Sequence, residues 1–209
     1  MLVQLQERGF NSQYQLAEMY VDGELEPRLR KRGWEAAVGL AISGFTYLQR
    51  RLGLMYSEAA KKNPRRYEQA FVWLRQASES GDALAQFELG QMYLAGRGVR
   101  QSDPSAAYWF EQAAHQGVGR AQYELGLAYR DGRGVSQNPW LAFSWMRKAA
   151  NRDWAPAQHE LGNMFLQGFG VGRNRERAFE WYHRAACHGH ELARLTIMNG
   201  DDRVARILH

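Results

Sequence analysis

A hexapeptide that recurs every 36 residues constrains the fold of this chain more than any other feature. The motif Ala-Gln-x-Glu-Leu-Gly occupies residues 85–90, 121–126 and 157–162. Four of the seven tryptophans follow the same spacing, at Trp73, Trp109, Trp145 and Trp181. A fixed period of this length indicates a stack of similar units, each too small to bury its own apolar face.

Each unit is predicted to contain two helices. Residues 120–130 and 141–151 both place apolar side chains three and four positions apart, which is typical of amphipathic helices. The Gly-x-Gly-Val segment between them fits a helix end that passes through left-handed backbone conformations. The glycines of this segment are Gly96, Gly98, Gly132, Gly134, Gly168 and Gly170. They account for much of the excess of 21 glycines over 5 prolines.

Capping and close packing give further expectations within each unit. Ser102, Asn138 and Asn174 each lie seven residues before a repeating tryptophan and are predicted N-caps of the second helix. A second set of glycines, Gly90, Gly126 and Gly162, falls inside the first helix. Each costs about 1 kcal/mol relative to alanine. We therefore expect the neighbouring helix to approach closely there.

The repeat can be followed through nearly the whole chain. Leu52-Gly53-Leu54-Met55-Tyr56 and Leu16-Ala17-Glu18-Met19-Tyr20 are degenerate copies without the loop glycines. We predict one repeat domain spanning 1–209, with repeats at 10–45, 46–82, 83–118, 119–154 and 155–190. Residues 1–9 and 191–209 are predicted to be terminal caps.

The pattern Ala-Gln-x-x-Leu-Gly-x-x-Tyr, Gly-x-Gly-Val, Ala-x-x-Trp and Ala-Ala resembles the SEL-one-like repeat, a relative of the tetratricopeptide repeat. The resemblance is strong over residues 83–190 and weaker over 10–82. It implies an all-α fold, a right-handed α/α superhelical solenoid of about five 36-residue helix-turn-helix repeats with terminal capping helices, whose first helices line the concave side. It also implies a non-enzymatic adaptor or scaffold that binds another protein or peptide, in bacterial relatives within signalling or regulatory assemblies.

Recognition residues are expected where the repeats differ on the exposed side of their first helices. Residues two before and two after each Leu-Gly leucine are four apart and share one helix face. With the next turn, these predicted partner-binding residues are Tyr14, Glu18, Arg50, Leu54, Phe87, Gln91, Leu94, Tyr123, Leu127, Arg130, His159, Asn163 and Leu166. Mixed aromatic, amide and charged side chains suit a peptide. The alternative is that Phe87, Tyr123 and His159 are partly buried between adjacent first helices.

Two other sets of residues admit a packing interpretation. Glu88, Glu124 and Glu160 occupy one register and could form an acidic ladder, but we interpret them as solvated helix formers. They could also pair with basic residues of a preceding second helix, such as Arg147 or Lys148. Four aromatic residues fall outside the repeating tryptophan position: Trp34, Trp140, Trp154 and Phe169. We interpret each as a packing residue, the alternative being an exposed binding spot.

Charge is concentrated near the N-terminus of the chain. Residues 26–66 contain ten basic and three acidic residues, whereas the net charge of the whole chain is +5. This basic segment provides an alternative function, electrostatic binding of nucleic acid or an anionic surface. No known nucleic-acid-binding motif is present, and the charges are mixed with apolar helix positions, which disfavours nucleic acid.

Other function classes find little support. His183, Cys187, His188 and His190 form the one metal-like group, but no cysteine pair accompanies them, so we predict no metal and no cofactor. No catalytic grouping stands apart from the repeat, and we predict no enzymatic activity. There is no apolar run near 18 residues. The lone cysteine and the absence of a visible signal peptide favour the cytoplasm, or the periplasm if the native start lies upstream.

Overall fold

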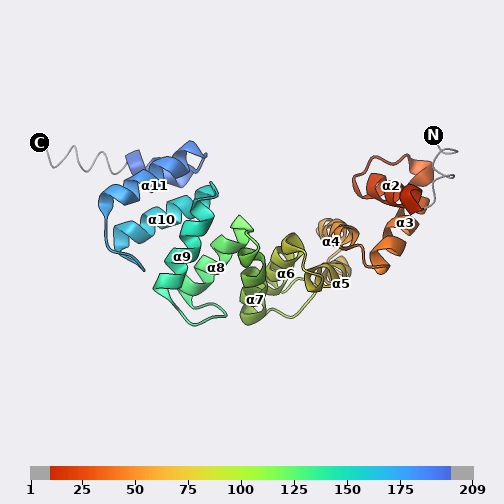
Figure 1. Ribbon diagram of the computed structural model, residues 1–209, viewed down its shortest axis with the longest axis horizontal. Helices are drawn as coiled ribbons and strands as arrows, with labels where there is room; N and C mark the ends of the chain where they lie inside the picture. Colours follow the sequence, from red (N-terminus) through yellow and green to blue (C-terminus); the bar gives the residue numbers. More distant parts are fainter. Residues whose placement is uncertain (1–9, 199–209) are drawn as a thin grey trace, which may run out of the picture. The chain divides into compact units, whose positions relative to one another are not determined.

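The computed structural model describes residues 10–198, and helices are the only regular elements within that range. The predicted all-α fold of helix pairs is therefore confirmed for this part of the chain. The chain divides into two compact units, Met1–Ser102 and Asp103–His209. The two units are coloured red to yellow-green and green to blue in Figure 1.

The N-terminal unit contains five α-helices and one short 3₁₀ helix among its described residues. They are α2 (Phe10–Val21), η1 (Pro27–Leu29), α3 (Arg30–Ile42), α4 (Thr46–Ala60), α5 (Arg66–Glu79) and α6 (Ala83–Ala95). Consecutive α-helices pack on one another, and α4 also contacts α2 (Figure 1). Leu40, Leu48 and Leu52 lie in one buried cluster and Leu74 and Met92 in another.

The C-terminal unit continues the same alternation of helices. Its helices are α7 (Asp103–His115), α8 (Gly119–Asp131), α9 (Pro139–Ala150), α10 (Ala155–Gln167) and α11 (Arg175–Cys187). Residues 191–198 are also helical, whereas the rest of the predicted caps, 1–9 and 199–209, lies outside the described residues. Met146, Leu161 and Tyr182 are almost wholly buried in a core built from α9, α10 and α11.

A buried glutamine ties each of the four first helices α4, α6, α8 and α10 to the helix before it. Its side-chain Nε2 donates a hydrogen bond of 2.9–3.1 Å to a carbonyl oxygen at the end of that helix. The donor and acceptor pairs are Gln49 with Ala41, Gln86 with Ser78, Gln122 with Ala114, and Gln158 with Ala150. The end carbonyls of a helix have no partner within the helix, so this bond gives the glutamine of the motif a structural role.

The predicted helix ends are confirmed where the structure records their geometry. Gly96, Gly132 and Gly168 are left-handed C-caps of α6, α8 and α10. The side chain of Asn138 accepts a hydrogen bond from the amide of Leu141 at 3.0 Å, and Asn174 caps α11 in the same way. Local sequence chemistry therefore sets the helix boundaries in the later repeats.

Close helix packing is confirmed at the glycines inside first helices. A Cβ built on Gly162 would lie 2.5 Å from the ring of Tyr182, and one on Gly126 would lie 3.2 Å from Cε of Met146. The degenerate repeat keeps this packing, since a Cβ on Gly53 would lie 2.6 Å from Leu74. These glycines let the second helix of each repeat lie directly against the first.

The packing interpretation holds for three of the four irregular aromatic residues. Trp34, Trp154 and Phe169 are half-buried and pack against the hydrophobic clusters. The interpretation is wrong for Trp140, which is 67% exposed at the start of α9. Trp140 lies in the first turn of α9, two residues after the N-cap Asn138.

Candidate partner-binding surface

All thirteen predicted partner-binding residues lie on the first helices α2, α4, α6, α8 and α10. Twelve of them are half-buried, and Phe87 is buried with 8% exposure. Tyr123, Leu127 and Leu166 pack at the edge of the C-terminal core. The surface is therefore a partly covered helix face in each unit, and Phe87 serves mainly to pack α6.

An ion pair joins two neighbouring first helices in the C-terminal unit. The guanidinium of Arg130 on α8 donates to the Glu160 carboxylate on α10 at 2.5 Å and to Asp131 at 2.7 Å. The hydrogen bond with Asp131 contributes most to raising the pKa of Arg130, Glu160 adds to it, and burial opposes it. Arg130 in turn lowers the pKa of Asp131. Arg130 thus stays charged and is held in place by two carboxylates.

The same network extends to the second helix α11. Asn163 donates a hydrogen bond to Glu160 at 3.1 Å and accepts one from the hydroxyl of Tyr182 at 2.8 Å. The Tyr182 side chain is otherwise buried in the core. A polar network thus fixes the orientation of Arg130 and Asn163, two of the predicted recognition residues.

His159 lies next to this network on α10. Its ring stacks on His190 with 4.7 Å between ring centroids and lies 5.5 Å from the ring of Tyr182. Burial lowers the pKa of His159, the nearby His190 lowers it further, and Glu160 opposes both. The imidazole is therefore neutral near pH 7 and presents a stacked, uncharged ring.

Stability of the chain should fall when His159 must be protonated. Because the pKa of His159 is lower in the folded than in the unfolded protein, the unfolded state binds more protons below the ordinary histidine pKa. Folding is therefore weakened as the pH falls from 7.5 to 5. We expect the melting temperature of the His159→Gln variant, measured by circular dichroism, to fall less over this pH range than that of the wild type. An equal loss in both proteins would show that His159 does not contribute.

The N-terminal unit holds its own set of partnered side chains. Arg50 on α4 pairs with Asp82 at 3.0 Å, with both side chains more than four-fifths buried, and its guanidinium lies 5.5 Å from the ring centroid of Tyr47. Tyr14 forms a hydrogen bond with Glu18, which together with burial raises the pKa of the tyrosine. The side chain of Arg50 is therefore held in place by interactions within the fold.

The expectation for the acidic register is wrong at Glu160. This carboxylate pairs with Arg130 on the preceding first helix, not with a second helix. Arg147 and Lys148 lie instead over the rings of Phe143 and Trp145. The register of first helices brings residues 30 positions apart side by side, a contact between repeats that spacing within one repeat does not predict.

Sequence reasoning missed the residues that orient this surface. Asp82, Glu160, Tyr182 and His190 all contact predicted recognition residues. Tyr182 carried a usable signal, because the same register holds Phe110 and Met146 in the earlier repeats and only Tyr182 has a hydroxyl. The other three are polar residues of types that usually lie on the surface. Their partners depend on how helices of different repeats meet.

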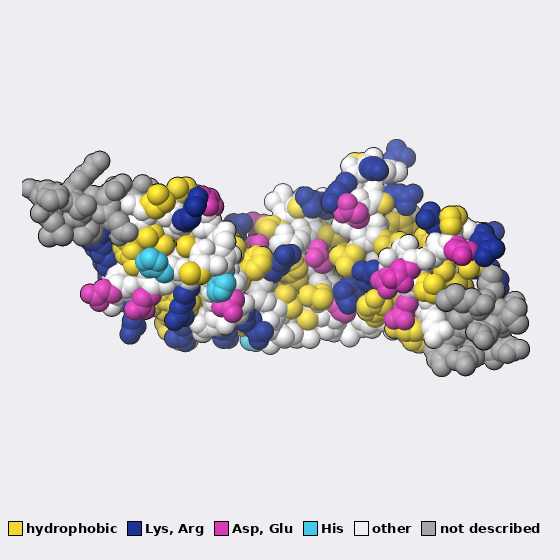
Figure 2. Space-filling view, turned by 90° about the horizontal axis from the view of Figure 1, so that it is seen from above, with side chains coloured by type: hydrophobic (Ala, Val, Ile, Leu, Met, Phe, Trp, Pro, Cys, Tyr) yellow, Lys and Arg dark blue, Asp and Glu magenta, His cyan; other side chains and the backbone are white. Residues whose placement is uncertain are grey.

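The basic segment is only partly engaged in ion pairs. Arg51 pairs with Asp22 at 2.6 Å and Lys61 with Glu58 at 2.6 Å. Other basic residues are exposed and form no ion pair among the described residues: Arg30, Lys31, Arg32, Lys62, Arg65 and Arg66. Dark-blue side chains accordingly gather along one edge of the N-terminal unit in Figure 2.

The metal-like group does not come together. Within the described part of the chain, no three His, Cys, Asp or Glu side chains are placed to share a metal ion. His188 Nδ1 lies 2.9 Å from Gln158 Oε1, and His190 stacks on His159. Cys187 is exposed. In the same described range, no helix is both long and apolar enough to cross a membrane.

Comparison with known proteins identifies the repeat. The family model described as Sel1 repeat matches residues 11–33, 46–82, 83–118, 119–154 and 155–190. A protective antigen of uropathogenic Escherichia coli with an SLR fold is 27% identical with a TM-score of 0.79, over 90% of this chain and 40% of that one. A Sel1 repeat protein from Oxalobacter formigenes is 37% identical with a TM-score of 0.62, over 68% of this chain and 57% of that one.

This chain thus spans about two fifths of the first of these structures and little more than half of the second. A third structure, a Sel1 repeat protein from Klebsiella pneumoniae, is 21% identical with a TM-score of 0.50 and shows the fold alone. The five matched segments follow the repeats expected from the 36-residue period, with the first one shortened. The chain is a member of the Sel1 repeat family.

Proposed function

We propose that this protein is a non-enzymatic scaffold that binds a peptide or protein partner on the exposed face of its first helices. Sel1 repeat proteins generally mediate protein–protein interaction. The thirteen residues named above are the proposed binding residues. Hydrogen bonds between side chains order two of those on α8 and α10, Arg130 and Asn163. The relatives in bacteria suggest a bacterial signalling or regulatory assembly. The exposed free thiol of Cys187 favours a reducing compartment such as the cytoplasm.

The observation that carries this proposal is the contrast between two sets of positions. Several side chains that tie the repeats together are the same in each, such as Gln86, Gln122 and Gln158. On the first-helix face the side chains differ, with Tyr123 in one repeat and His159 in the next. Packing alone does not require such differences, whereas recognition of an asymmetric partner does.

The charged part of this face is already ordered. Arg130 is clamped by Glu160 and Asp131, and Asn163 is held by Glu160 and Tyr182. Side chains held in one orientation lose less conformational entropy when a partner binds. The face is thus suited to a partner that places a hydrogen-bonding group next to an apolar contact on Leu127.

A comparison of two matched variants tests the proposal. The face variant Tyr123→Ala/Leu127→Ala and the control Tyr108→Ala/Trp140→Ala each remove two large side chains from the C-terminal unit. The control residues are exposed on second helices, at 53% and 67%. Proteins captured from native cells should be at least tenfold depleted with the face variant and unchanged with the control, as quantified by mass spectrometry. Equal recovery by two equally helical proteins would overturn the assignment.

A further inference from the structure

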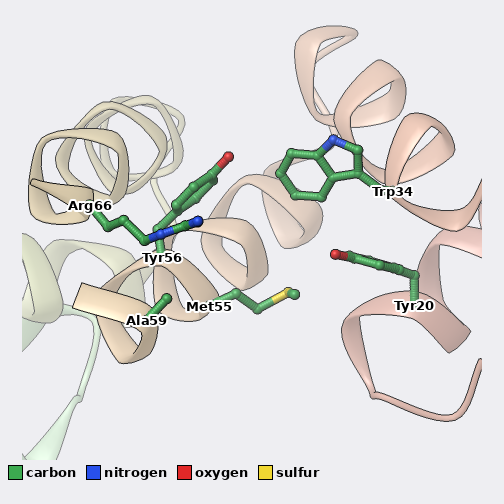
Figure 3. A pocket seen from close by; sticks show the side chains of 6 residues that line it. All are labelled: Tyr20, Trp34, Met55, Tyr56, Ala59 and Arg66. Atoms are coloured by element: carbon green, nitrogen blue, oxygen red, sulfur yellow. The ribbon is translucent and has the colours of Figure 1, made fainter. Parts of the chain in front are cut away.

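An aromatic pocket of about 250 Å³ opens in the N-terminal unit, and none of the proposed binding residues lines it. It is lined by Tyr20, Trp34, Met55, Tyr56, Ala59 and Arg66. Figure 3 shows the side chains of α2 and α3 on one side facing those of α4 on the other, with Arg66 extending along the ring of Tyr56. All except Arg66 are half-buried. The volume far exceeds the roughly 15 Å³ that one water molecule needs.

The walls of this pocket belong to the repeat itself. The rings of Trp34 and Tyr56 meet edge to face at 5.9 Å between centroids. Equivalent pairs recur in later repeats, with Phe71 against Tyr93 at 5.6 Å and Phe143 against Phe165 at 5.5 Å. An aromatic pair at this place is thus normal for the fold, and what differs is the loop beside it.

In the C-terminal unit the Gly-x-Gly-Val loop lies beside the equivalent aromatic pair, Phe143 and Phe165, and helps to line a hollow of about 360 Å³. Val171 packs against the core and forms part of the wall of the corresponding hollow in the C-terminal unit. Ideal Cβ atoms on Gly98 and Gly170 would clash with the backbone oxygens of Tyr67 and Pro139, so the loop lies directly on the preceding second helix. The loop therefore supplies one wall of this hollow through its backbone and one valine.

The repeat 46–82 lacks this loop. Its first helix α4 continues to Ala60, and the valine of the next repeat aligns with Lys62, which is exposed. The first residue of α3, Arg30, aligns with Tyr67, the residue that the loop covers in the next repeat, and Arg30 is exposed as well. The pocket beside Trp34 consequently lacks the wall that the loop supplies in the C-terminal unit.

The rim of the pocket carries an unusual positive charge. Lys61, Lys62, Arg65 and Arg66 fall within six residues, and the flanking acidic residues in the sequence are Glu58, which is paired with Lys61, and Glu68. The first turn of α3 holds three further exposed cations and no acidic residue. Cations at a helix N-terminus oppose the helix dipole and weaken the helix. By contrast, the hollow of the C-terminal unit includes Glu180 among its arginines.

We propose that this pocket binds an acidic peptide segment of a partner protein, which inserts one large apolar side chain between Trp34 and Met55. The apolar lining matches the anchor, and the cations of the rim match carboxylates on either side of it. This is a second interaction site, separate from the first-helix face, and it does not require that the first-helix proposal is correct.

The geometry favours a peptide over nucleic acid. Binding of single-stranded nucleic acid through aromatic side chains uses open ring faces on which bases stack. Here the guanidinium of Arg66 lies 5.8 Å from the centroid of the Tyr56 ring, and Trp34 meets the same ring edge to face. The rings therefore form the walls of a hole for a compact side chain and not a platform for stacking.

Fluorescence anisotropy with labelled heptapeptides tests the proposal. Each peptide has three acidic residues on both sides of a central Phe, Leu, Trp, Met or Ser, and an oligothymidine of equal charge is the nucleic-acid probe. We expect at least one apolar peptide to bind at least fivefold more tightly than the serine peptide. Ala59→Leu should abolish that preference by filling the pocket, whereas Ala95→Leu, at an exposed site on α6, should not. Lys62→Glu/Arg65→Glu should weaken all acidic peptides at least tenfold.

Three outcomes would overturn the proposal. Equal binding of the serine and apolar peptides would show that the pocket is not used. Tighter binding of oligothymidine, insensitive to Ala59→Leu, would assign the basic rim to nucleic acid. Self-association of the wild type that Ala59→Leu removes, seen by analytical ultracentrifugation, would assign the pocket to a second copy of the chain.

Discussion

Replacing Gly134 with alanine is expected to lower the free energy of unfolding by about 3 kcal/mol, from about 1–2 kcal/mol of left-handed backbone strain and a similar overpacking cost. Gly134 has a φ of +73°, and a Cβ there would lie 2.2 Å from the backbone oxygen of Asp103. A backbone oxygen at the start of α7 cannot rotate away as a side chain can. The loop must therefore lift from α7 or the helix must shift.

Gly132→Ala is the matched control, two residues earlier in the same loop. Its φ is +70°, but the nearest atom to a Cβ would be Cβ of Gln137 at 3.4 Å, an ordinary contact. We expect a loss of about 1 kcal/mol from the left-handed conformation alone. Urea denaturation followed by circular dichroism measures both. If the two variants lose equal stability, the loop does not rest on the backbone of α7 as described.

Local chemistry explains why so much of the fold could be predicted. The N-caps Asn138 and Asn174 act within three residues of their own position, and Gly96 and Gly132 end helices by their own backbone conformation. Such features depend on the sequence nearby and on nothing else. The 36-residue period then placed them in register, so each repeat supported the prediction for the next.

The candidate surface could be predicted only as a set of positions. The face was found from spacing, but the pairing of Arg130 with Glu160 depends on which side chains from different repeats reach each other. Phe87 and Tyr123 share a register, yet Phe87 is buried and Tyr123 half-buried. The pocket beside Trp34 could not be predicted, because it lies where side chains of α2, α3, α4 and α5 meet, which residue spacing alone does not determine.

Gly162→Ala is expected to cost more stability than Gly126→Ala, the same substitution in the preceding repeat. A Cβ on Gly162 would lie 2.5 Å from Cε1 of Tyr182 and 3.0 Å from the oxygen of Ala178, and Tyr182 is only 1% exposed. The ring cannot move into solvent without breaking its hydrogen bond to Asn163. Gly162→Ala should therefore cost about 2–3 kcal/mol by overpacking, despite the better helix propensity of alanine.

Gly126→Ala provides the comparison, since the same substitution meets a softer neighbour there. The nearest atom to its Cβ would be the terminal Cε of Met146 at 3.2 Å, followed by two backbone atoms at 3.4 Å. A methionine end adapts readily, and alanine gains about 1 kcal/mol of helix propensity, so we expect stability within about 1 kcal/mol of the wild type. In Gly126→Leu the branched side chain must enter the contact between α8 and α9, and the methionine cannot make enough room for it. This variant should lose about 3 kcal/mol or more of its free energy of unfolding. Equal urea midpoints for Gly126→Leu and the wild type would contradict close helix packing as the reason for glycine in this motif.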